Sequence, residues 1–72
     1  MSKAYNQGDK VKWKWGDNWA HGKVAKRYTQ KITLKIDGNE VTRDASEDEP
    51  AYKVEQSDGG EALKSHSELN KE

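Results

Sequence analysis

The chain contains no cysteine, only one proline and no long run of apolar residues. Without cysteine, neither disulfide bonds nor thiolate metal sites can supplement the hydrophobic core. No stretch approaches the roughly 20 apolar residues of a membrane-spanning helix, and the N-terminus lacks the apolar segment of a secretion signal. We therefore expect a soluble cytoplasmic protein with no membrane association.

The chain is also short, at 72 residues. A chain of this length buries only about 60% of the surface that it exposes when unfolded, so a deep catalytic cleft is not expected. His21 and His66, the only imidazoles, do not stand in a metal-binding spacing, and no catalytic or cofactor motif occurs. We predict one non-enzymatic, monomeric domain over residues 5–69, with no cofactor or metal and with flexible termini at 1–4 and 70–72.

The net charge of zero hides a strong division of charge along the chain. Residues 1–36 contain nine Lys or Arg and two Asp, whereas residues 37–72 contain four basic and eleven acidic residues. A single domain built in this way either displays two oppositely charged regions or interleaves them. Because strand pairing brings distant segments together, we expect much of the division to cancel in the fold.

Apolar residues alternate with polar ones in several short segments, which is the period of a half-buried β-strand. Strands are predicted at residues 10–15, 19–28, 32–36 and 40–43, then after Pro50 and at 62–64, with one helical turn at 65–69. The sequence Asp37-Gly38-Asn39 predicts a tight hairpin turn. Gly22 lies inside a strand pattern, which favours a bulge or a sharp bend at that position.

Five or six short antiparallel strands without a long helix predict an all-β fold, a small and partly open SH3-like barrel. The expected core comprises the inward-facing apolar residues of these strands and of the final turn. They are Val11, Trp13, Val24, Ile32, Leu34, Ile36, Val41, Tyr52, Val54, Leu63 and Leu69.

Three segments of the chain resemble the hypervirulence-associated protein Tudor-domain family. They are Gly8-Asp9-Lys10-Val11-Lys12-Trp13, Gly22-Lys23-Val24, and the segment from Ala45 to Val54, whose Ser-Glu-Asp-Glu-Pro-x-Tyr-x-Val pattern is the most specific part. The resemblance spans nearly the whole chain. It implies a Tudor-like barrel, but it brings no substrate, cofactor or catalytic residue with it.

The acidic corner at Glu47, Asp48 and Glu49 has two interpretations. In the first, Ser46 forms a local turn with backbone amides before Pro50 begins the next strand, and the carboxylates pair with the basic half of the chain. In the second, the three carboxylates dock a basic partner. Turn residues of this kind favour the structural interpretation.

Aromatic residues suggest a ligand-binding cage. Trp15 and Trp19 flank the turn Gly16-Asp17-Asn18, and Tyr28 or Tyr52 could complete a wall around a cationic ligand. Tudor domains use such cages for methylated lysine or arginine. The alternative is that these rings only cover the open end of a small barrel.

A basic patch is predicted on the outside of the first strands. Its members are Lys10, Lys12, Lys14, Lys23 and Lys35, with Lys26, Arg27 and Lys31 on neighbouring strands or their ends. Lysines beside exposed aromatic rings suit single-stranded nucleic acid, whereas edge strands also carry lysine simply to prevent aggregation.

These observations predict an interaction module that binds a protein or peptide through its aromatic loop or an exposed strand edge. The alternative function is nucleic-acid binding through the lysine-rich first strand and exposed aromatics. A third possibility, a structural protein with no ligand surface, requires that Trp15 and Trp19 be buried.

Overall fold

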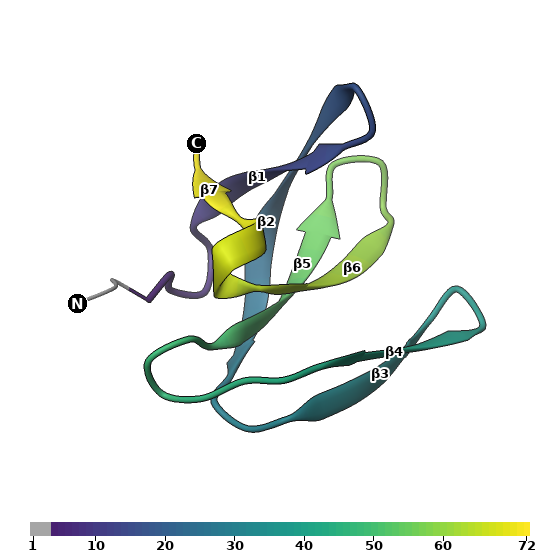
Figure 1. Ribbon diagram of the computed structural model, residues 1–72. Helices are drawn as coiled ribbons and strands as arrows, with labels where there is room; N and C mark the ends of the chain where they lie inside the picture. Colours follow the sequence, from purple (N-terminus) through teal and green to yellow (C-terminus); the bar gives the residue numbers. More distant parts are fainter. Residues whose placement is uncertain (1–3) are drawn as a thin grey trace.

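The computed structural model describes residues 4–72, which form an all-β domain with one short 3-10 turn (Figure 1). The strands are β1 (Lys10–Trp15), β2 (Asn18–Tyr28), β3 (Ile32–Ile36), β4 (Asn39–Arg43), β5 (Ala51–Gln56), β6 (Glu61–Ser65) and β7 (Asn70–Lys71), and the 3-10 turn η1 (His66–Glu68) precedes β7. No helix in the described part of the chain has the length and apolarity that a membrane span requires.

The strands form two antiparallel sheets that do not close into a complete barrel. The larger sheet has the order β6-β5-β2-β1-β7, and the smaller one is the hairpin β3–β4, which extends along one side of the domain (Figure 1). The turn of this hairpin has positive φ at both Asp37 and Gly38, as a two-residue type I′ turn requires. The predicted hairpin and the predicted small, partly open β fold are therefore confirmed.

Strand β5 is buried on one face at Tyr52 and Val54 and on the other at Ala51, and the core is divided into two clusters. Tyr52 and Val54 project from one face into a cluster with Trp13, and Leu69 from the C-terminal segment closes this cluster. Ala51 projects from the other face and packs with Leu63 and Ile36, against the apolar residues of β3 and β4. The hairpin β3–β4 thus covers the β5–β6 end of one face of the main sheet.

The predicted core is largely correct. Eight of its members are buried: Val11, Trp13, Val24, Ile36, Tyr52, Val54, Leu63 and Leu69. Ile32, Leu34 and Val41 are only half-buried, because they pack on the second cluster from a two-stranded sheet whose other face meets solvent. Ala51 was not predicted but is fully buried, because it packs with Ile36 and Leu63 in the second cluster.

The C-terminal residues 70–72, expected to form a flexible tail, lie along the edge of the main sheet. Asn70 and Lys71 pair with Lys12 and Val11 of β1, and the backbone N–H of Glu72 donates to the carbonyl oxygen of Lys10. Buried Leu69 anchors this short strand to the core. Of the N-terminal residues 1–4, also expected to be flexible, only Ala4 is among the described residues.

Gly22 permits a close contact between strands, and the bulge that was one of the two alternatives at this residue lies elsewhere in β2. The register of β2 against β5 shifts between Val24 and Lys26, so the bulge lies three residues further along the chain, at Ala25. A Cβ atom at Gly22 would lie 2.5 Å from the carbonyl oxygen of Glu55 and 3.3 Å from Cη2 of Trp13. Glycine is therefore required here by the approach of the β5 backbone and the Trp13 ring.

We expect Gly22→Ala to destabilise the domain by about 1–3 kcal/mol, because the added methyl group would push β5 away from β2. Urea unfolding at neutral pH measures the effect. Gly60→Ala is the control, since the three atoms nearest to a Cβ there, at 3.2 to 3.7 Å, all belong to the side chains of Asp58 and Gln56. Equal stability of the two variants would contradict this explanation.

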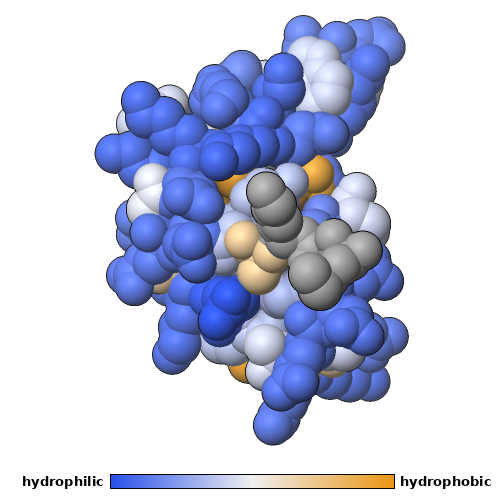
Figure 2. Space-filling view, turned by 90° about the vertical axis from the view of Figure 1, so that its left-hand side faces the viewer, coloured by the Kyte–Doolittle hydropathy of each residue, from blue (hydrophilic) through white to orange (hydrophobic). Residues whose placement is uncertain are grey.

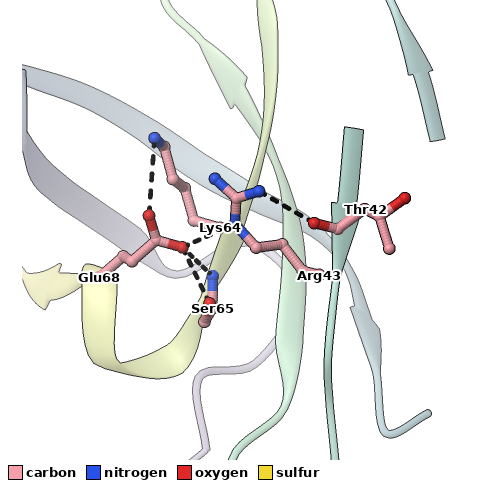
Figure 3. A network of polar contacts seen from close by, with 5 residues as sticks. All are labelled: Thr42, Arg43, Lys64, Ser65 and Glu68. Atoms are coloured by element: carbon pink, nitrogen blue, oxygen red, sulfur yellow. Dashed lines mark hydrogen bonds and ion pairs between the residues drawn. The ribbon is translucent and has the colours of Figure 1, made fainter. Parts of the chain in front are cut away.

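Glu68 joins the two sheets through a polar network (Figure 3). Its Oε1 accepts hydrogen bonds from Arg43 Nε at the end of β4, at 3.0 Å, and from both the backbone N–H and the hydroxyl of Ser65, each at 2.8 Å. Its Oε2 lies 3.9 Å from Lys64 Nζ. Burial by itself raises the pKa of Glu68, but the hydrogen bonds from Ser65 and Arg43 outweigh burial and hold the pKa below its usual value of 4.5.

A lowered pKa in the folded state means that Glu68 stabilises the fold above about pH 4.5, and that this contribution is lost as the pH falls through the folded-state pKa. We expect Glu68→Gln to cost about 1 kcal/mol at neutral pH, because solvent reaches about a third of the side chain and screens its charge. Urea unfolding from neutral to acidic pH should show this difference shrinking. A stability difference between wild type and Glu68→Gln that does not change with pH would contradict this role of Glu68. An equal loss of stability in Glu47→Gln would also contradict it.

Candidate functional site

Six side chains of β1 and β2 form a surface that we call the basic face: Lys10, Lys12, Lys14, Trp19, His21 and Lys23. The hairpin register places Lys10 opposite Lys23, Lys12 opposite His21, and Lys14 opposite Trp19. Paired residues of antiparallel strands project to the same side of a sheet. The basic face is therefore the side opposite to that of buried Val11 and Trp13.

Two lysines at the outer end of this face lie close to the ring of Trp19. The Nζ atoms of Lys12 and Lys14 lie 5.1 and 5.6 Å from the centroid of the indole ring, within the range of cation–π attraction. The ring itself is 45% exposed. The arrangement holds two ammonium groups beside an accessible aromatic surface.

Two carboxylates of the second half of the chain border the basic face on its β5 and β7 sides. Glu55 lies opposite Lys23 in the register, and Glu72 Oε1 lies 2.6 Å from His21 Nδ1. These four residues and Lys10 are among those that line a shallow hollow of about 410 Å³. Positive charge is thus partly balanced near Lys10, His21 and Lys23.

The side of the domain that carries β7, the neighbour of β1, is mostly hydrophilic (Figure 2). Figure 2 shows the side of the domain that carries β7 and the N-terminal end, where hydrophilic residues dominate and apolar colour is confined to small areas. Lys35, predicted to join the patch, lies instead in the second sheet, opposite Glu40. The predicted patch therefore loses this member and keeps the other four.

Trp15 marks a second candidate surface, at the tip of the β1–β2 hairpin. It shares the strand face of Val11 and Trp13 but lies beyond the core, and it is 68% exposed. Beside it is a hollow of about 330 Å³, lined by Trp13, Trp15, Asn18, Trp19, Ala20 and Gln56. The tip of the hairpin therefore combines an exposed ring with a recess.

The predicted aromatic cage does not assemble. Tyr52 is fully buried in the core and cannot face a ligand, because its ring fills the space beside Trp13 and Val54. Tyr28 lies at the opposite end of β2, where Lys26 Nζ is 5.5 Å from its ring. Only Trp15 and Trp19 lie at one place, and the hairpin register puts them on opposite strand faces.

Tyr52 instead anchors the N-terminal segment and η1. Its hydroxyl accepts a hydrogen bond from the Tyr5 N–H, at 3.0 Å, and lies 3.0 Å from Nδ1 of His66. Burial raises the pKa of Tyr52. The ring of Tyr5 stacks on His66, with 5.0 Å between centroids, so this cluster is part of the packing. Among residues 4–72, no three His, Asp or Glu side chains gather as a metal site would require.

The acidic corner forms the structured turn that its sequence favours. The backbone N–H of Glu49 donates to Ser46 Oγ at 3.1 Å, and the Ser46 N–H donates to the carbonyl oxygen of Glu49 at 3.0 Å. Glu47, Asp48 and Glu49 are exposed. The corner precedes Ala51, which pairs with Tyr28, so it lies at the end of β2 remote from Lys14 and Trp19.

The contact of Lys12 and Lys14 with Trp19 was not predicted, although the sequence contains a signal for it. A two-residue turn at Gly16-Asp17 would by itself pair Trp15 with Asn18 and Lys14 with Trp19, as observed. The proximity of Glu72 to His21 had no local signal, because it depends on the path of the chain after Leu69.

One protein family, the TUDOR domain of hypervirulence associated proteins, matches residues 8–69. Searches of curated proteins and of solved structures give no match. The matched region begins just before β1, includes all six residues of the basic face, and ends at Leu69. Glu72, which borders the face, lies outside the matched region. The chain belongs to the family of hypervirulence-associated TUDOR domains.

Proposed function

We propose that this domain is a non-enzymatic interaction module that binds a polypeptide segment at the tip of the β1–β2 hairpin. The observation that carries the proposal is Trp15, a tryptophan with 68% of its surface exposed beside a hollow. Tryptophan is enriched in the buried centre of protein interfaces, and exposure of so large a ring is unfavourable in an isolated domain.

The hollow suits a side chain of the partner better than a whole small ligand. Its volume of about 330 Å³ lies at the lower end of the range for ligand sites. Trp13 and Ala20 supply apolar surface, while the side-chain amides of Asn18 and Gln56 can hydrogen-bond the backbone of an extended segment. An apolar side chain could therefore fill the recess while its backbone is held at the rim.

Membership of a Tudor-type family supports an interaction role, and the exposure of both hairpin tryptophans argues against a purely structural protein. The absence of an assembled cage removes the main reason to expect methylated lysine or arginine as the ligand. We therefore take an apolar side chain as the recognised group.

The test is to select short random peptides on the immobilised domain and to measure their affinity for the wild type and for Trp15→Ala. We expect peptides with a large apolar residue, and a loss of about 30-fold or more on removal of Trp15, which is typical of a central interface residue. The folding stability of Trp15→Ala should stay within about 1 kcal/mol of the wild type, since the ring is largely exposed.

Tyr28→Ala is the control, because this half-buried aromatic residue lies at the other end of β2. Its peptide affinities should match the wild type. Selected peptides that bind Trp15→Ala as tightly as the wild type would refute the proposed site, as would a selection that enriches no peptide at all.

A further inference from the structure

We propose that the basic face binds single-stranded nucleic acid, with the phosphate backbone along the lysines of β1 and a base against Trp19. The lysines of this site lie on the opposite strand face from Trp15, although Trp19 also borders the hollow beside Trp15. The inference follows from the charge, the exposed ring and the shape of this surface.

The charge of the face fits a polyanion. Lys10, Lys12 and Lys14 alternate along β1 and leave the same face of the strand, with Lys23 opposite Lys10 at the inner end. Lysines that neutralise phosphates release condensed counterions, which gives affinity without reading a sequence. A row of lysines along a strand therefore matches an extended phosphate backbone.

The exposed ring of Trp19 favours a nucleic acid over a polyanion that has no aromatic groups. Its ring is 45% exposed, and the ammonium groups of Lys12 and Lys14 lie within 6 Å of it. A phosphate bound by either lysine brings its own base close to an indole on which it can stack. Stacked bases and charged backbones are the two components of single-strand binding surfaces.

The shape of the site favours a single strand over a duplex. The residues of the basic face lie on a β-hairpin of the main sheet, and no helix in the described residues is available to enter a major groove. Bases stacked within a duplex could not reach Trp19. An acidic polypeptide would satisfy the lysines but would leave the ring without a stacking partner.

The zero net charge of the chain does not oppose this proposal, because the acids are distributed unevenly. The acidic corner, Glu47, Asp48 and Glu49, lies near the far end of β2. Glu68 accepts a hydrogen bond from Arg43. Glu55 lies opposite Lys23, and Glu72 pairs with His21, so these two carboxylates border the inner and middle parts of the basic face. We therefore expect the strongest binding at the outer part, around Lys12, Lys14 and Trp19.

The experiment is a fluorescence anisotropy titration of labelled oligothymidylate with the full chain at low salt. Contacts with about three or four phosphates predict an affinity that falls roughly 20- to 50-fold between 50 and 200 mM salt. Trp19→Ala should weaken binding by about 5- to 150-fold, the equivalent of one stacked base. Lys12→Glu with Lys14→Glu should reduce the affinity at least tenfold, because it reverses two charges beside the ring.

The matched control is Lys31→Glu with Lys35→Glu, which changes the net charge equally at two exposed lysines outside the face. This variant should retain affinity within about fourfold of the wild type. Lys12→Gln with Lys14→Gln repeats the test without introducing acids on neighbouring strand positions. Circular dichroism of each variant verifies folding.

Three outcomes would overturn the proposal. They are the absence of oligonucleotide binding at low salt, an equal loss in both charge-reversal variants, and an unchanged affinity in Trp19→Ala. Poly-glutamate at the same charge concentration distinguishes the ligand class: equally tight binding would identify a surface for acidic protein and refute a nucleic-acid site.

Discussion

The fold depends on the start of β5, where Ala51 and Tyr52 are buried on opposite faces of the strand. In a short chain without disulfide bonds, one strand must bring two small apolar clusters together, and β5 does so with Tyr52 and Val54 on one side and Ala51 on the other. Its neighbours β2 and β6 are held by hydrogen bonds, and β3–β4 is held by packing and by the contact of Arg43 with Glu68. Segments that are far apart in the sequence are therefore assembled around a strand from the acidic half of the chain.

This arrangement determines how far the division of charge is cancelled. Strands β5 and β7 come from the acidic half and lie beside β2 and β1, which places Glu55 opposite Lys23 and Glu72 beside His21. Pairing with β7 reaches only Val11 and Lys12. The hairpin extends beyond its neighbours, so Lys14 and Trp19 pair with each other and with no strand from the acidic half. The division of charge along the sequence thus becomes a local feature of one hairpin.

Sequence periodicity predicted the elements whose structure depends on neighbouring residues. It failed where contacts with distant segments determine the role of a residue. Alternation identified β1, and Asp37-Gly38 identified the β3–β4 turn, because both depend on neighbouring residues alone. The role of Gly22 was misinterpreted because glycine is required there by the backbone of β5, which lies more than thirty residues away in the sequence. Alternation placed Tyr52 correctly in the core, but it did not reveal that Tyr5 and His66 cover the hydroxyl end, so Tyr52 was also considered as a cage wall.

The candidate surfaces follow from the register of the β1–β2 hairpin. With Gly16-Asp17 as the turn, Trp15 continues the core face, and Trp19 meets Lys14 on the opposite face. A shift of register by one residue would exchange every side chain between the two faces of a strand. Trp19 would then leave the lysines, and Trp13 could no longer lie against Gly22 in the core. Because the packing of Trp13 fixes the register, the requirement for a stable core also determines that the hairpin presents a basic aromatic face on one side and an apolar recess on the other.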